Sequence, residues 1–472
     1  MEDLLALAVR VGEEAGAELV EARGEDITVF SMRSEKKTVK LVDYKRIVGV
    51  GVRVFADGAT GYAYTNMLTR EAVREAAVRA FRIAKAASRH TKLRLHPAEC
   101  KPARGTFRVE VRRHPGEASI DEKKEALHAG EREAEEVAGR LLATTISRYG
   151  EAYGWRYLVS SDSEARVEFL VASMGFSVVC KEGGEMADAA DSFGGTVGFE
   201  AFTGEHSPEV MGGNAARWAL EKLRGVKPPV GKHRALVDNR LAGVLAHESF
   251  GHMSEYDFVA TGGSPLAGKI GQRLGSNEAT VVDEGVVGVE GYPGFRVPCD
   301  DEGVEARRVV ILEEGVLRSY LHTRWTASLA GVEPTGNARA VDYTFEPICR
   351  MRNTYFTPGD LTLEEALEQL RNGVYACGTA GGQANFDGSF MFKATRGYLV
   401  EGGEVKAAFK DVAILGHILE FLRNIEAKTG ELKVYSSFFG GCGKMGQAPL
   451  YVGLGGPHIL VKEAMFGGER VG

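Results

Sequence analysis

Residues 241–252 read Leu241-Ala242-Gly243-Val244-Leu245-Ala246-His247-Glu248-Ser249-Phe250-Gly251-His252. The preceding run Ala235-Leu236-Val237-Asp238 predicts a strand, and residues 240–253 predict a helix that delivers His247, Glu248 and His252. Two histidines that flank a glutamate are the usual parts of a hydrolytic zinc site. The imidazole nitrogens bind the metal, and the carboxylate can take a proton from metal-bound water. This stretch therefore predicts a metal centre carried on a helix.

The spacing of the two histidines is one residue longer than in the familiar His-Glu-x-x-His pattern. Positions four apart lie about 40° apart around a regular helix, whereas positions five apart lie about 140° apart. His247 and His252 can share one metal only where the helix is locally wound with i to i+5 bonds. Such a distortion costs least at Gly251. We therefore predict a bulged or kinked helix at Gly251.

The motif alone leaves a second interpretation open, in which both histidines are hydrogen-bonded structural residues and Glu248 is solvated. A catalytic zinc usually takes three protein ligands and leaves one position for water. The candidates for a third ligand are Cys442, His206, His322, His417, His458, Glu255 and Asp257.

Cys442 lies in the glycine-rich run 440–447, where the backbone can approach a metal closely. Lys444 could help to keep the Cys442 thiol deprotonated. A flexible turn with an incidental cysteine is the alternative interpretation of the same run.

A compact acidic cluster, Asp300-Asp301-Glu302-Gly303, stands between these motifs. It could bind a hard cation, but the alternating oxygen ligands of a calcium loop are missing. We therefore expect a turn with solvated carboxylates.

The length of 472 residues predicts at least two domains. Lys227-Pro228-Pro229-Val230-Gly231 is the best boundary, because prolines and glycine stop a helix and favour an exposed connection. The second half is also rich in glycine: 60 residues of the whole chain are glycine, roughly 13%, against about 7% in an average protein. The predicted fold class is α+β, with a mixed helix/strand N-terminal domain over residues 1–226. A strand-rich, glycine-rich C-terminal domain over residues 227–472 carries the metal-site helix.

Periodicity predicts further elements. Asp57-Gly58 is a strong hairpin signal between two strands within residues 46–65. The predicted helices lie at 2–16, 69–87, 120–142, 208–223, 361–372 and 414–426. The predicted strands of the first half lie at 26–30, 156–160, 166–182 and 194–202.

Charge and hydropathy exclude several classes of protein. The net charge is −7 and no basic stripe is present, so a nucleic-acid partner is not expected. No run reaches the roughly 18 apolar residues that a membrane span needs, and acidic residues stand where a secretory signal requires positive charge. Six scattered cysteines without a Cys-x-x-Cys pair indicate no disulfide framework. We expect a cytoplasmic protein without a membrane partner.

Together these segments resemble the TldD/PmbA family of metallopeptidases, and most closely its TldD branch. The resemblance covers about residues 233–468, and the first half is similar only in its general plan. Cys349 stands where the family often has proline, which leaves the metal site unaffected. The segments that carry the resemblance are 247–257, 300–303, 335–339, 350–354 and 442–447.

The resemblance implies that His247, His252 and Cys442 hold Zn²⁺ and that Glu248 is the general base. It implies a zinc metallopeptidase that hydrolyses unfolded proteins or short peptides through zinc-bound water. A heterodimer with a related, metal-free PmbA/TldE-type subunit is also implied, with this chain as the active subunit. One alternative is a regulatory or binding protein with a structural metal or none; another is a zinc hydrolase acting on a non-peptide amide.

Overall fold

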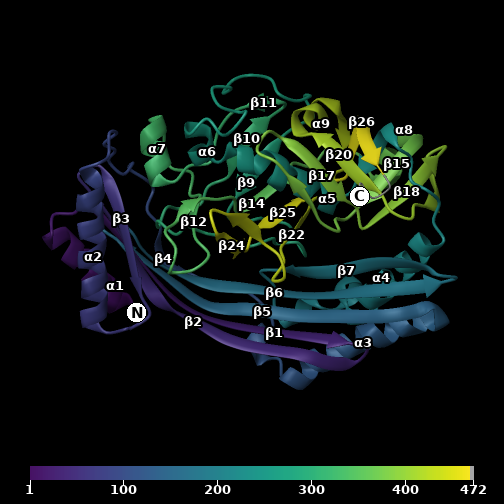
Figure 1. Cartoon of the computed structure of the whole chain (residues 1–472), viewed down its shortest axis with the longest axis horizontal. Coiled ribbons are helices and arrows are strands. Elements are labelled where there is room, and N and C mark those ends of the chain that lie inside the picture. Colours follow the sequence, from purple (N-terminus) through teal and green to yellow (C-terminus); the bar gives the residue numbers. More distant parts are fainter. Residues whose placement is uncertain (468–472) are drawn as a thin grey trace.

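Long strands dominate the first part of the chain, and they form one strongly curved sheet (Figure 1). The computed structural model describes residues 1–467. The sheet has seven strands in the order β3-β2-β1-β5-β6-β4, with β7 also paired to β6. Its pairs are antiparallel except for β4 with β6. The strands are β1 (Leu19–Glu35), β2 (Thr38–Ala56), β3 (Ala59–Thr65), β4 (Arg104–Phe107), β5 (Leu142–Ser160), β6 (Glu164–Glu182) and β7 (Glu185–Gly195).

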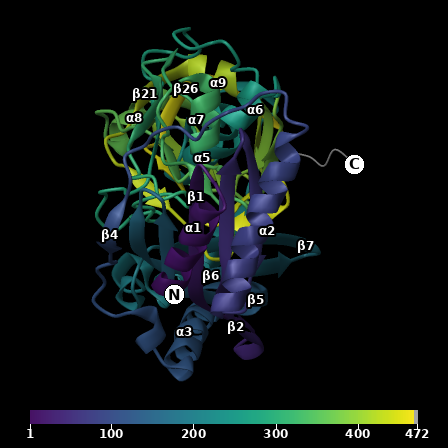
Figure 2. The ribbon, with the colours of Figure 1, turned by 90° about the vertical axis from the view of Figure 1, so that its left-hand side faces the viewer.

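The two faces of this sheet are buried by different parts of the chain, because successive side chains of a strand point to opposite faces. Phe30 and Met32 pack with Leu127 and the helices, whereas Ile27 and Val29 pack with Phe295 of the second half. Four helices therefore cover one face and the C-terminal part covers the other (Figures 1 and 2). The helices are α1 (Glu2–Glu14), α2 (Arg70–Ser88), α3 (Ile120–Ala138) and α4 (Pro208–Leu223).

The C-terminal part contains a nine-stranded mixed sheet in the order β16-β17-β20-β26-β8-β15-β18-β19, with β21 also paired to β26. Its helices include α8 (Leu363–Leu370), which contacts β8, and α9 (Ile418–Asn424), which contacts β26. The strands are β8 (Gly231–Val237), β15 (Asn372–Cys377), β16 (Gly382–Ala384), β17 (Ser389–Lys393), β18 (Arg396–Glu401), β19 (Glu404–Ala408), β20 (Ala413–His417), β21 (Ile425–Lys428) and β26 (Ile459–Gly467).

A second sheet of six strands, in the order β11-β10-β9-β14-β25-β22, completes the layers of this part. Helix α5 (Asn239–Val244) contacts both sheets, through β15 of the larger sheet and through β14, β22 and β25 of the smaller one. The strands are β9 (Val281–Glu284), β10 (Val309–Glu313), β11 (Val316–Leu317), β14 (Asn353–Phe356), β22 (Lys433–Tyr435) and β25 (Gly453–Gly456). Shorter elements are α6 (Tyr256–Ala260), α7 (Arg324–Ala330) and the paired strands β12 (Ala338–Arg339) with β13 (Ile348–Cys349) and β23 (Cys442–Lys444) with β24 (Gln447–Leu450).

This architecture confirms the predicted α+β class, with helix and strand mixed in the first half and a strand-rich second half. The predicted hairpin is confirmed as well. Asp57 and Gly58 have φ values of +51° and +76° and connect β2 to β3, the backbone of a tight two-residue turn. Within residues 1–467, no helix combines the length and the apolar character that crossing a membrane would need.

One predicted strand is wrong, and one predicted helix begins later than expected. Strand β7 ends at Gly195, and the region predicted as a strand at 194–202 continues as a loop with a 3₁₀ turn at Phe199–Ala201. The helix predicted at 414–426 begins only at Ile418, because residues 413–417 form β20. The His417 ring accepts a hydrogen bond from the Leu419 N–H and so caps the helix start.

The acidic cluster at 300–302 is buried, and the prediction of solvated carboxylates is wrong. Arg23 of β1 pairs with Asp301 at 2.8 Å, and Arg53 of β2 pairs with Glu302. The Asp300 carboxylate accepts backbone N–H groups of the surrounding loop, including that of Ala338 at 3.0 Å. The cluster therefore fastens the C-terminal part to the long strands of the N-terminal sheet.

Candidate metal centre

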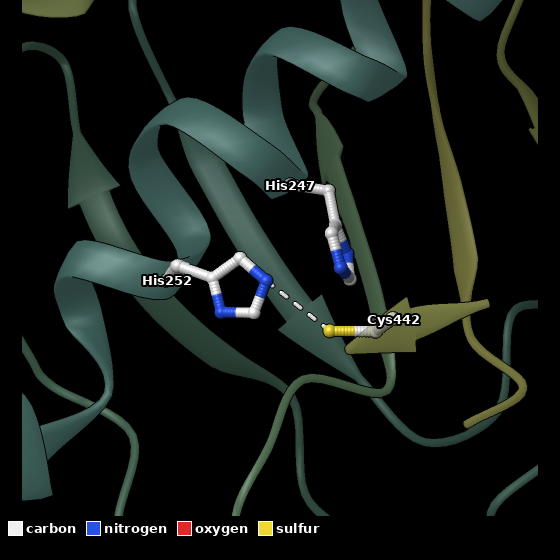
Figure 3. Close-up of side chains that lie close together, drawn as sticks. All are labelled: His247, His252 and Cys442. Carbon is white, nitrogen blue, oxygen red and sulfur yellow. Dashed lines mark hydrogen bonds between the residues drawn. The ribbon is translucent and has the colours of Figure 1, made fainter. Parts of the chain in front are cut away.

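The helix that carries the motif changes its winding before it reaches His252. The Asp238 carboxylate caps α5 by accepting the Leu241 N–H at 2.9 Å. The backbone then continues into a π-helical segment, Leu245–Gly251, and a 3₁₀ turn, His252–Ser254. The predicted distortion at Gly251 is confirmed, and its π-helical form brings His247 and His252 to the same side of the helix (Figure 3).

Three side chains from distant segments meet beside this helix. The ligand atoms of His247, His252 and Cys442 all lie within 4.8 Å of one another, and all three residues are buried. His252 Nε2 and Cys442 Sγ are 3.2 Å apart (Figure 3). Nitrogen and sulfur ligands of one tetrahedral zinc would lie about 3.3–3.6 Å apart, given bonds of about 2.0–2.3 Å. The separation of His252 Nε2 and Cys442 Sγ is therefore close to that of two ligands of one tetrahedral ion.

His247 has the character of a metal ligand. Both of its ring nitrogens are buried and have no hydrogen-bond partner among the described residues, a costly state for an imidazole. Burial lowers the pKa of His247 well below its ordinary value, and the positive charges of His252 and Arg350 act in the same direction. The ring therefore stays neutral near pH 7, which is the form that binds a metal. A metal ion at this point would satisfy the orphaned nitrogen.

His252 is held by a buried chain of charges. Its Nδ1 lies 2.9 Å from Glu255 Oε2, which leaves Nε2 to face Cys442. Burial acts to lower the pKa of His252, but the Glu255 carboxylate and the Cys442 sulfur outweigh it and raise the pKa. Lys444 Nζ donates to Glu255 at 3.1 Å and to Asp257 at 2.7 Å. Glu255 thus fixes the orientation of the imidazole, as carboxylates commonly do behind metal-bound histidines.

The remaining candidate ligands lie outside this cluster within residues 1–467. Glu255 and Asp257 stand behind His252 and bind Lys444, so the Lys444 ammonium is paired with two carboxylates. The four other candidate histidines have different surroundings: His206 stacks on Phe193, His322 lies against Tyr256, His417 caps α9, and His458 contacts the Tyr375 hydroxyl.

Glu248 is the most exposed of the three residues His247, Glu248 and His252. Its side chain is 38% exposed, whereas that of His247 is 0% exposed. The Glu248 Oε2 atom lies 3.7 Å from His252 Nε2. Burial of the carboxylate raises its pKa above the ordinary value, although His252 opposes the change. This position suits a group that exchanges protons with water beside the metal cluster.

A pocket of about 560 Å³ opens onto this face of the centre. Glu248 and His252 form the end next to the His247, His252 and Cys442 cluster, and α6, β16 and the β23–β24 hairpin form its walls. The size falls within the range of roughly 300–1,000 Å³ that is common for small-molecule sites.

Arg350 is a residue beside the centre that sequence reasoning did not single out. It is fully buried, and its Nε and Nη2 atoms have no hydrogen-bond partner among the described residues. Within residues 1–467, the only hydrogen bond of its side chain is a 3.3 Å contact from Nη1 to the Gln447 carbonyl. In the sequence, Arg350 stands out only because it belongs to segment 350–354, one of the segments that resemble the TldD/PmbA family. The resemblance assigns no role to Arg350.

Comparison with known families places three sequence models on the chain. The model described as PmbA/TldA metallopeptidase C-terminal domain matches residues 230–468. Those described as PmbA/TldA metallopeptidase domain 1 and central domain match residues 20–84 and 113–223.

Individual proteins are similar over most of their length. A metalloprotease of Methanothermobacter thermautotrophicus is 33% identical and covers 92% of both chains. A zinc metalloprotease TldD homolog of Saccharolobus solfataricus is 30% identical and covers 74% of this chain and 76% of its own. Among solved structures, TldE from Thermococcus kodakarensis superposes with a TM-score of 0.78 at 19% identity, covering 98% of this chain and 100% of its own. At that identity the last comparison speaks for the fold alone.

Proposed function

The chain belongs to the PmbA/TldA metallopeptidase family, and from this membership we propose that it is a zinc-dependent peptidase acting on unfolded proteins or short peptides. The observation that carries the proposal is His247, a buried imidazole with no hydrogen-bond partner for either nitrogen among residues 1–467. It faces a second imidazole and a thiol within metal-binding distance.

Zinc is the metal that fits this donor set best. Two imidazole nitrogens and one thiolate are borderline-soft ligands, and three protein ligands leave a tetrahedral ion one position for water or substrate. The name of the Saccharolobus solfataricus relative, a zinc metalloprotease, supports the same choice. When bound, zinc would supply Lewis-acid chemistry that polarises a carbonyl and makes water more acidic.

The residues around the centre would divide the remaining work. Glu248, exposed to the pocket and with a raised pKa, accepts a proton from the attacking water and passes it to the leaving amine. Glu255 and Lys444 keep His252 oriented through their buried contacts. Cys442 contributes its sulfur from the β23–β24 hairpin, which also forms one wall of the pocket.

An extended peptide has a sheet edge available beside the pocket. Strand β16 is the last strand of the nine-stranded sheet in its order, and its Ala384 lines the pocket. Backbone bonds along this edge would by themselves select little among side chains, and they would bring a peptide carbonyl close to the water beside Glu248. A structure with a bound peptide that runs elsewhere would contradict this arrangement.

We also propose that the working enzyme is a heterodimer with a related subunit of the PmbA/TldE type that lacks the histidine motif. Family membership supports this pairing. Mixing the purified chain with such a subunit should give a complex by size-exclusion chromatography and a gain in peptide hydrolysis. Separate elution with no gain in activity would contradict the pairing.

The peptidase proposal is tested by metal analysis and peptide hydrolysis on three variants. Glu248→Gln should keep about one zinc per chain and lose roughly 10²–10⁴-fold in rate, because the general base is gone. Cys442→Ala should lose most of the zinc. Cys349→Ala is the matched control, since Cys349 is equally buried but outside the ligand cluster, and it should keep both zinc and activity.

Normal cleavage by Glu248→Gln would refute the mechanism. Full zinc binding by wild type without hydrolysis of any peptide, alone or with the partner subunit, would favour the non-catalytic alternative.

A further inference from the structure

The pocket beside the metal centre is walled mainly by apolar side chains. Phe258 of α6 and Phe386 of the loop after β16 pack with their ring centroids 4.5 Å apart. Met445 projects from the tip of the β23–β24 hairpin on another wall. The apolar lining residues are Met253, Phe258, Ala384, Phe386, Met445 and Ala448.

Two of these side chains are unusually exposed for their type. Phe386 is 54% exposed and Met445 is 69% exposed, although both belong to short, well-defined loops. The loop of Phe386 is held by hydrogen bonds: the Gly388 N–H donates to the Asn385 carbonyl at 2.9 Å, and the Asp387 carbonyl lies 2.8 Å from His417 Nε2. The Phe386 ring is therefore kept at the pocket instead of collapsing into the core.

The charges around the pocket are already neutralised. Apart from His252 at the end next to the cluster, Lys444 is the one cation among the described lining residues. Its Nζ binds Asp257 and Glu255 and lies 4.2 Å from the Phe258 ring centroid. Glu248 is the one carboxylate of that lining, and it stands at the same end as His252. A charged substrate side chain would find no free partner of opposite sign away from the metal.

We propose that this pocket binds an apolar, preferably aromatic or long aliphatic, side chain of the peptide next to the scissile bond, and that Phe386 is the main specificity-determining residue. The inference rests on the proposed peptidase function and adds the substrate class to it. Contact with Phe258, Phe386 and Met445 removes apolar surface of the substrate from water, whereas Asp or Lys at the same position would be desolvated without compensation.

The test compares peptides that are identical except at the residue on either side of the cleaved bond, where Phe, Leu, Ala, Asp or Lys is placed. For zinc-loaded wild type with its partner subunit, kcat/KM should be about 10–200-fold higher for Phe or Leu than for Ala at one of the two positions. Phe386→Ala should reduce this ratio several-fold, and Phe386→Asp should reverse the order of the Phe and Lys peptides. Met391→Ala is the control, because Met391 is 51% exposed on β17 of the same hairpin but does not line the pocket.

A binding measurement separates this inference from the peptidase proposal. The affinities of the same peptides for the Glu248→Gln variant, measured by fluorescence anisotropy, should show the same apolar preference and the same loss on Phe386→Ala, even if wild type cleaves none of them. Equal affinities for all peptides, or an equal effect of Phe386→Ala and Met391→Ala, would overturn the inference. So would a Phe386→Ala variant that only weakens association with the partner subunit.

Discussion

Glu255 acts on the candidate metal centre through His252. Its carboxylate contacts His252 Nδ1 at 2.9 Å and is itself fully buried. Loss of such a partner from a metal-bound histidine typically costs 10–100-fold in metal affinity, because the ring orientation and tautomer are no longer fixed. We expect Glu255→Gln to weaken zinc binding by about that factor in a chelator competition assay.

The control for this experiment is Glu151→Gln, which removes a carboxylate that is equally buried but bound to Lys123 under the N-terminal sheet. It should leave zinc affinity unchanged. An equal loss of affinity in both variants would assign the effect of Glu255 to general destabilisation.

At the scale of residues, the sequence predicted the cluster members but not their surroundings. His247, Glu248 and His252 could be found from spacing and chemistry, whereas Cys442 was one candidate of several until the family resemblance was added. Nothing in local spacing shows that Lys444 turns toward Asp257 and Glu255, or that Arg350 is buried beside the centre. Those contacts form between segments that are far apart in the sequence. Lys444 is 95 residues from Cys349 and 189 residues from Glu255, and it binds both.

The π-helical segment Leu245–Gly251 needs glycine at its last position. A Cβ on residue 251 would lie 2.1 Å from Met351 Sδ, and Met351 is itself fully buried. Gly251→Ala should therefore lower the free energy of unfolding by about 1–3 kcal/mol, despite the better helix propensity of alanine. Denaturant unfolding followed by circular dichroism measures the change.

A double-mutant cycle tests the reason for this loss. Met351→Ala makes room for the new methyl group, so the pair should show a favourable coupling of about 1 kcal/mol or more. Gly288→Ala is the matched control, because a Cβ there meets nothing within 4 Å. Additive effects of Gly251→Ala and Met351→Ala would show that the clash is not the cause.

At the scale of elements, helices were predicted more accurately than strands. The helix expected at 208–223 has those bounds, whereas β5 begins at Leu142, far before the strand expected at 156–160. The signals that mark a helix, its periodicity and its caps, come from residues close together in the sequence. The capping box of Ser119 and Glu122 at the start of α3 is an example. The length of a strand depends on the neighbour that continues beside it, and β5 is paired along most of its length with both β1 and β6.

The two large parts of the molecule are joined by buried ion pairs. Asp301 binds Arg23 at 2.8 Å and Arg156 at 3.4 Å, and all three residues are largely buried. Asp301→Asn would remove the negative charge that balances the buried guanidinium groups of Arg23 and Arg156. We therefore expect the free energy of unfolding to fall by about 3–5 kcal/mol. Glu185→Gln, which breaks the exposed Glu185–Lys410 pair between the same two parts, should change it by at most about 1 kcal/mol. Comparable losses in the two variants would contradict a special role for the buried pairs.

Stability should also depend on pH through Glu21 at this interface. Burial raises the pKa of Glu21 from 4.5 to about 7, against the opposing effect of Arg53. A carboxyl group with a raised folded-state pKa contributes stability that is fully present below about pH 4.5 and is lost as the pH rises through about 7. The shift corresponds to on the order of 3 kcal/mol.

The measurement is the midpoint of thermal unfolding for wild type and Glu21→Gln between pH 4.5 and 7.5. The stability of wild type relative to Glu21→Gln should fall across this interval, since glutamine does not titrate. A constant difference would mean that the pKa of Glu21 is the same in the folded and unfolded chain.

The arrangement of the whole molecule could be predicted only in part. Length, glycine content and the proline-rich segment at 227–231 led to the α+β class, and the division into 1–226 and 227–472 stays a prediction. The burial of the acidic run at 300–302 could not be predicted, because its partners, Arg23, Arg53 and Arg156, come from three strands far away in sequence. A buried charge cannot be told from a solvated one until its partner is known.

Strand β26 has a further consequence for how the chain is made. It follows every other described strand in sequence, yet it lies between β20 and β8 in the nine-stranded sheet. During synthesis, the strands on both sides of β26 therefore leave the ribosome before β26 does. These are β16, β17 and β20 on one side and β8, β15, β18 and β19 on the other. A released chain truncated before residue 459 should therefore remain open to protease between residues 231 and 457, because the sheet beside the helix with the two histidines then lacks β26.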